Sequence, residues 1–165
     1  MVIAAIFSGC ANTPTRQATV DSRPPRLQLT VGVPPSMSIL RDEEISEAFA
    51  YRVSSILKEQ GLRGRIRYVD DWEKPVPDIP VLAIELREWR VDRSGFVDCT
   101  FTASINTPAG SRRLGVFTGT SIMTWARRDW FARMDGFEDA ARDAISTLAA
   151  RLEQSGALNQ ATRGM

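Results

Sequence analysis

The chain has 165 residues, of which 43% are hydrophobic and 25% charged, a composition typical of a soluble domain with one packed core. Its 21 basic and 20 acidic side chains leave a net charge of +1, so the overall charge gives no attraction to nucleic acid or another polyanion. The chain has no histidine, the most common general base near neutral pH and the most common metal ligand, which argues against an enzyme and a metal cofactor.

The N-terminus combines a short apolar run with a cysteine. Residues 1–7 are too few for a membrane span, which needs about 20 apolar residues, and residues 1–9 are interpreted as a truncated signal peptide. The run Phe7-Ser8-Gly9-Cys10 resembles the lipobox of bacterial lipoproteins, where small residues precede a cysteine that is lipidated and becomes the mature N-terminus. The resemblance implies that Cys10 carries a lipid anchor such as palmitate. The alternative is a plain N-terminal segment with an incidental cysteine.

Residues 10–25 predict a disordered tether, because they are rich in Thr, Pro, Ser and Ala and have no helical or strand periodicity. Flexible-chain scaling places the domain about 20 Å from its anchor on average. In lipoproteins that resemble this chain, Asp directly after the lipidated cysteine favours retention in the inner membrane. Ala11 therefore implies an outer-membrane anchor with the domain facing the periplasm.

A single domain is expected over residues 26–154, and it begins with a strand and a helix. Apolar residues alternate with Gln28, Thr30 and Gly32 over residues 27–33, the period-two pattern of a half-buried strand. After Asp42, a candidate N-cap, apolar residues recur on one helical face. Gly61 then marks the end of this helix.

The second half of the domain is predicted to contain four strands and a final helix. A short strand at Ile66–Tyr68 precedes a loop over residues 70–80 that contains Trp72 and three prolines. Residues 81–91, 96–105 and 114–123 predict strands joined by tight hairpin turns. The last helix is expected to begin at Asp135, with Glu138 completing a capping box, and a polar flexible tail follows over residues 155–165.

The predicted order is strand, helix, four strands and helix, and each helix has one apolar face. The economical packing is an α+β fold in which two helices cover one face of a mostly antiparallel four- to five-stranded sheet.

This order, preceded by a lipobox and a tether, resembles the small bacterial envelope lipoproteins of the lipopolysaccharide-assembly and YajG-like type. The domain order is also similar to the auxiliary lipoproteins of envelope lipid transporters. The resemblance covers nearly the whole chain in organisation, whereas its motif covers only Phe7 to Cys10. It implies a stabilising or adaptor role in an envelope machine.

No catalytic constellation is predicted. Ser55-Ile-Leu-Lys58 matches the S-x-x-K pattern of penicillin-recognising enzymes, but the companion motifs are missing and both residues fall outside the apolar stripe. Glu85 and Glu88 have unlike parity on a strand and are expected on opposite faces. Cys99 shares its strand face with apolar residues and is interpreted as a core side chain.

Two segments are candidate binding surfaces. Arg63, Arg65 and Arg67 alternate along one strand and form a candidate anion-binding face, which Arg87 could extend, against the alternative of a plain solvated face. The segment between the last strand and helix is a candidate partner interface, with packing against the helix as the competing explanation. Its candidate residues are Trp125, Arg127, Arg128, Trp130 and Phe131.

The leading hypothesis is a non-enzymatic, lipid-anchored periplasmic adaptor or accessory subunit of a cell-envelope assembly or transport complex. Its expected partners are the membrane and an envelope protein, with no cofactor, metal or nucleic acid. The alternative is a carrier or sensor of an amphiphilic lipid or glycan, which requires an apolar cleft.

The lipobox resemblance generates a first prediction. The full-length protein should incorporate labelled fatty acid and fractionate with membranes, whereas Cys10→Ala should do neither, because the thiol is the only acceptor that the motif offers. Metabolic labelling followed by membrane fractionation measures both properties. Equal labelling of the two proteins would contradict the prediction of a lipid anchor at Cys10.

Overall fold

The structure, a computed structural model, describes residues 26–35, 42–62, 64–70, 72–122 and 130–156. The elements are β1 (Leu27–Gly32), α1 (Asp42–Glu59), β2 (Ile66–Tyr68), β3 (Val81–Val91), β4 (Phe96–Thr107), β5 (Gly110–Ile122) and α2 (Trp130–Ser155). This order and the α+β class are those predicted from the sequence. No helix in the described part of the chain is both long and apolar enough to span a membrane.

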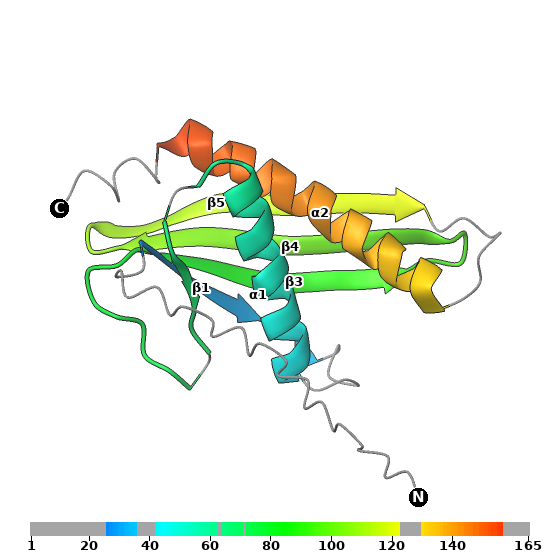
Figure 1. Cartoon of the computed structure of the whole chain (residues 1–165), viewed down its shortest axis with the longest axis horizontal. Helices are drawn as coiled ribbons and strands as arrows, with labels where there is room; N and C mark the ends of the chain where they lie inside the picture. Colours follow the sequence, from blue (N-terminus) through cyan, green and yellow to red (C-terminus); the bar gives the residue numbers. More distant parts are fainter. Residues whose placement is uncertain (1–25, 36–41, 63, 71, 123–129, 157–165) are drawn as a thin grey trace, which may run out of the picture.

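The five strands form one mixed sheet in the order β2-β1-β3-β4-β5. The long ladders, β3 with β4 and β4 with β5, are antiparallel, whereas β1 pairs in parallel with both β2 and β3. Both helices lie on the same face of the sheet, with α2 running diagonally across β5 and β4 (Figure 1). The other face is covered by no described helix.

The core follows from strand alternation. Every second residue of β4 from Val97 to Ile105 is buried beneath the helices, while the residues between them point to the open face. Phe49 of α1 is fully buried and makes edge-to-face ring contacts with Trp89 of β3 and Phe101 of β4, both at 5.5 Å. These contacts hold α1 on the middle of the sheet.

Gly119 of β5 allows α2 to approach the sheet closely. A Cβ atom at this position would lie 2.2 Å from the carbonyl oxygen of Ala140 and 2.5 Å from the nitrogen of Ala144. Ala140, Ala141 and Ala144 on the facing side of α2 are also buried and small. Backbone therefore packs against backbone at this crossing.

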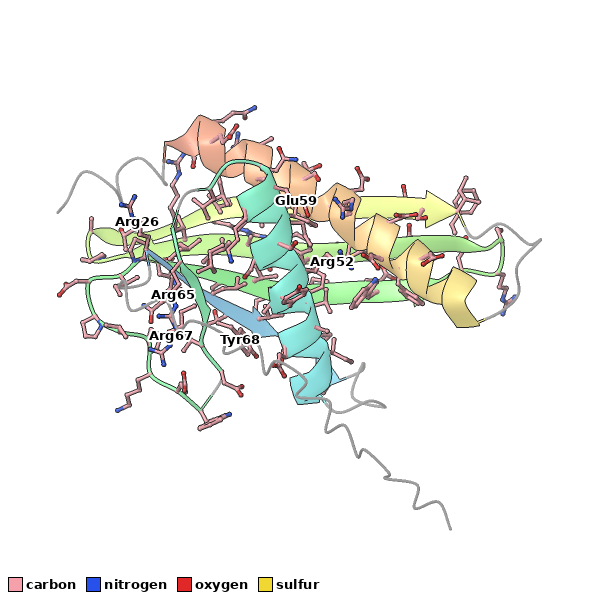
Figure 2. All side chains as sticks on the ribbon, in the orientation of Figure 1. Arg26, Arg52, Glu59, Arg65, Arg67 and Tyr68 are labelled. Atoms are coloured by element: carbon pink, nitrogen blue, oxygen red, sulfur yellow. The ribbon has the colours of Figure 1, made fainter. Side chains whose placement is uncertain are left out.

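Two surface ion pairs connect the helices. Arg52 of α1 pairs with Glu138 of α2, and Glu59 of α1 accepts a hydrogen bond from Arg142 of α2 at 2.9 Å. Figure 2 shows Arg52 and Glu59 along the length of α1. Because all four side chains are partly exposed, these pairs orient the helices more than they stabilise them.

The predicted start of the last helix was wrong. The helix begins at Trp130, so Asp135 and Glu138 lie inside it and form no capping box. A capping box contributes less to helix stability than tertiary packing does. Here the ring of Phe137, in the N-terminal part of α2, contacts the ring of Trp89 with a centroid distance of 5.6 Å, and this packing favours a helix that begins before Asp135.

The expected separation of Glu85 and Glu88 was also wrong. The ladder between β3 and β4 shifts register between Leu86 and Glu88, which leaves Arg87 as an extra residue. Glu85 and Glu88 consequently pair with Thr102 and Thr100, two residues on the same face of β4. Glu88 forms an ion pair with Arg90.

The close crossing at Gly119 generates the second prediction. Gly119→Ala should destabilise the domain by about 3 kcal/mol or more, because the new methyl group meets backbone atoms that cannot rotate away. Thr120→Ala, on the neighbouring exposed position, should cost less than about 1 kcal/mol. Chemical denaturation measures both changes, and equal values would show that α2 does not pack here at this distance.

Candidate functional site: the β2 rim

The edge strand β2 separates apolar and basic side chains by its alternation. Ile66 and Tyr68 pair with Leu27 and Leu29 of β1 and therefore face the helices. The Tyr68 hydroxyl donates a hydrogen bond to Ser46 of α1 at 2.9 Å, which ties the edge to the helix layer. Arg67 points to the opposite side.

Arg67 forms the best-defined polar contact of this edge. Its guanidinium lies 2.9 Å from the carboxylate of Glu73 in the following loop. The Glu73 amide in turn donates to the carbonyl of Asp70 at 2.9 Å, which closes a turn around Trp72. The pair is about one-third exposed on both sides, so its contribution to stability is small and its main effect is to fix the turn.

Arg26, directly before β1, lies at the same edge. Its backbone nitrogen donates to the carbonyl of Arg65 at 2.9 Å. Its aliphatic stem lies over Gly64, where a Cβ atom would come within 2.6 Å of the Arg26 Cδ. Gly64 also has a φ of +130°, so glycine is required here for both conformation and space. Figure 2 shows Arg26, Arg65 and Arg67 in a row along this side of the molecule.

The loop after β2 is held by Gln28, a buried side chain whose place in the sequence indicates only a polar position of the first strand. Its carboxamide oxygen accepts from the Val76 nitrogen at 2.7 Å, and its nitrogen donates to the carbonyls of Val76 and Ile79 at 2.9 and 3.2 Å. Gln28 is fully buried, so these contacts replace hydrogen bonds to water. Because Gln28 and Val76 are 48 positions apart, no local sequence pattern signals this contact.

The held loop presents apolar surface to solvent. Trp72 is 78% exposed and Val76 is 39% exposed. We use the name β2 rim for the surface formed by the edge strand and this loop. Its residues are Arg26, Arg65, Arg67, Trp72, Lys74 and Val76.

The sequence-predicted sites are only partly within the described residues. Cys10, Arg63, Trp125, Arg127 and Arg128 lie outside them. The backbone of Trp130 and Phe131 begins α2, but their side chains are not described. The partner interface predicted for these residues remains a prediction.

Two of the three arginines of the predicted anion-binding face, Arg65 and Arg67, lie within the described residues. Arg65 is exposed and Arg67 is half-buried, and both belong to the β2 rim. Arg87 does not extend it: Arg67 aligns through Gln28 with Val81, and Arg87 lies six residues further along β3, about 20 Å by strand rise.

The candidate catalytic side chains find no common site. The Ser55 hydroxyl donates to Glu59 at 3.3 Å, and Lys58 is exposed. Cys99 is fully buried in the core, as predicted, and desolvation raises the pKa of its thiol from 9.0 to about 12. The thiol is therefore protonated at physiological pH and is a poor nucleophile. No group of acidic or cysteine side chains suited to a metal ion occurs among the described residues.

Comparison with known proteins supports the fold. No protein-family model matches the chain, and no curated protein matches it. The structure of protein XCC0632 from Xanthomonas campestris is similar with a TM-score of 0.53 at 15% identity, covering 81% of this chain and 87% of that chain. At this identity, the similarity shows a shared fold and not a shared function.

More distant solved structures include bacterial lipoproteins. Rare lipoprotein B from Shewanella oneidensis has a TM-score of 0.36 at 14% identity and covers 84% of this chain and 99% of its own. A minor lipoprotein from Acinetobacter baumannii has a TM-score of 0.38 at 13% identity, with 81% and 94% covered.

The contacts of Gln28 generate the third prediction. Gln28→Leu should lower the free energy of unfolding by about 1 to 3 kcal/mol, because it leaves the polar backbone groups of Val76 and Ile79 without their partner. Hydrogen exchange of the Val76 amide should accelerate more than that of the Phe101 amide. Gln60→Leu, at an exposed position after α1, is the matched control. Unchanged exchange at Val76 would show that Gln28 does not hold the loop.

Proposed function

We propose that the protein is a lipid-anchored adaptor or accessory subunit of a cell-envelope assembly or transport complex, which acts by binding. The observation that carries the proposal is the Phe7-to-Cys10 lipobox followed by a polar segment that leads into one small α+β domain. The role follows the resemblance to the YajG-like type of envelope lipoprotein. Ala11, placed after the lipidated cysteine, favours an outer-membrane anchor.

The chemistry of the domain is consistent with binding at its surface. Its described interior is apolar apart from hydrogen-bonded side chains, and no buried side-chain nitrogen or oxygen among those residues lacks a partner. Trp72, the most exposed large apolar side chain among the described residues, lies on the β2 rim together with the exposed Arg26, Arg65 and Lys74.

The fourth prediction concerns the partner of the protein and is tested by crosslinking in cells. The full-length protein should capture the same envelope protein repeatedly, and Cys10→Ala should lose it, because the anchor confines the domain to the membrane surface. If the segment before α2 is the interface, a combined Trp125→Ala, Trp130→Ala and Phe131→Ala variant should also lose it.

Lys58→Ala provides the matched control, since Lys58 is exposed on α1 and belongs to none of the candidate surfaces. Capture that is unaffected by Cys10→Ala would contradict the anchored adaptor. A lipid that copurifies in place of a protein would favour the carrier hypothesis.

A further inference from the structure

The β2 rim combines three properties that no single element would produce. It presents a large indole to water, it holds that indole on a fixed backbone, and it carries cations next to it. Together they indicate what kind of surface the rim contacts.

The indole of Trp72 is the most exposed large apolar side chain among the described residues, at 78%. Val76, from the same loop, adds a second exposed apolar side chain. Trp is amphipathic, with a broad apolar ring and one N–H donor, and it is enriched where apolar and aqueous phases meet. In the isolated domain, most of this ring surface is in contact with water.

Hydrogen bonds hold the described backbone around the ring. Before Val76 lies the turn closed by Glu73 and Asp70, and Val76 itself is bound through its nitrogen and its carbonyl by Gln28. A surface that is ordered before binding loses little conformational entropy when it docks. The buried carboxamide of Gln28 therefore holds the loop that follows Trp72.

The charges next to the ring favour an anionic surface. Arg67 pairs with Glu73, the acidic neighbour of Trp72, and compensates its charge. Arg26 and Lys74 are exposed, and neither has an ion pair with another described residue, whereas the same loop has one exposed acidic side chain among the described residues, Asp78. Arg and Lys side chains at such an edge are suited to phosphate oxygens.

The course of the chain favours a bilayer over a protein. Arg26 belongs to the rim and is the residue at which the segment from Cys10 enters the domain. If the segment is disordered, as its composition predicts, a chain of this length would hold its two ends about 20 Å apart on average. A lipid on Cys10 would thus keep the rim close to the head groups, at a high effective concentration.

We propose that the β2 rim docks on a phospholipid bilayer that contains anionic head groups. The Trp72 ring enters the head-group layer, while Arg26 and Lys74 bind lipid phosphates. This inference rests on the proposed lipid anchor for its geometry, and it predicts an orientation: the sheet edge faces the membrane and α2 points away along the opposite edge.

The fifth prediction tests this contact without the anchor. The chain from residue 10, carrying Cys10→Ser, should sediment with vesicles of phosphatidylglycerol and phosphatidylethanolamine and far less with phosphatidylcholine vesicles. Adding Trp72→Ser should weaken binding by about tenfold or more, as expected when one interfacial ring is removed. Tyr51→Ser is the matched control, because Tyr51 is 74% exposed on α1 and lies outside the rim.

The charge component is tested separately. Arg26→Gln combined with Lys74→Gln should reduce binding to the anionic vesicles only, and added salt should reproduce the loss in the parent chain. Melting of each variant should match the parent, since all of the altered side chains are exposed. Quenching by brominated lipids should be strong in the parent chain and weak after Trp72→Phe.

The remaining outcomes overturn the inference. These are absence of vesicle binding, or binding that Trp72→Ser leaves intact. If vesicles are not bound but Trp72→Ser abolishes the crosslink to an envelope protein, the rim is a protein interface and the adaptor function stands. A different result would contradict the proposed function but not the lipid contact. In that case the vesicles are bound through Trp72, but Cys10 is not labelled and no partner is crosslinked.

Discussion

The packing of Phe49 against the sheet is the contact on which the rest of the domain depends. Its ring touches Trp89 and Phe101, and these two rings extend the contact to Phe137 of α2 and Phe117 of β5. Aromatic rings thus connect both helices with the three long strands. Because edge-to-face contacts fix relative orientation as well as distance, they place both helices on one side of the sheet.

Because both helices pack on one face of the sheet, the binding surface that we propose lies at the edge of the sheet. At β2, the strand has only three residues, and the side chains that would otherwise meet a second layer meet the loop instead. Gln28 shows the consequence most clearly, because it points away from the helices and is nevertheless fully buried by backbone of that loop. The surface that we propose for binding is therefore created where the layered architecture ends.

The sequence was sufficient to predict the class, the order of elements and the buried faces of residues such as Phe49 and Cys99, since alternation and helical periodicity report burial directly. It was insufficient where one extra residue changes parity, as Arg87 does between Leu86 and Glu88. Of the three arginines that alternation predicts to share a face, only Arg67 lies in β2. The link from Gln28 to Val76 joins residues 48 positions apart and leaves no periodic pattern.

The close crossing at Gly119 also determines how copies of this domain can associate. From Leu114 to Ile122 the edge strand β5 carries no charge, a composition that invites pairing with another strand. Consider two copies whose β5 strands pair symmetrically about Gly119, where α2 lies directly on the strand. Their α2 helices would then be separated by about the spacing of neighbouring strands, roughly 5 Å. Packed helices need an interaxial distance of about 8 to 10 Å. The helix that covers β5 (Figure 1) thus sterically blocks self-association in this register, while an incoming strand with no helix above it would meet no such obstacle.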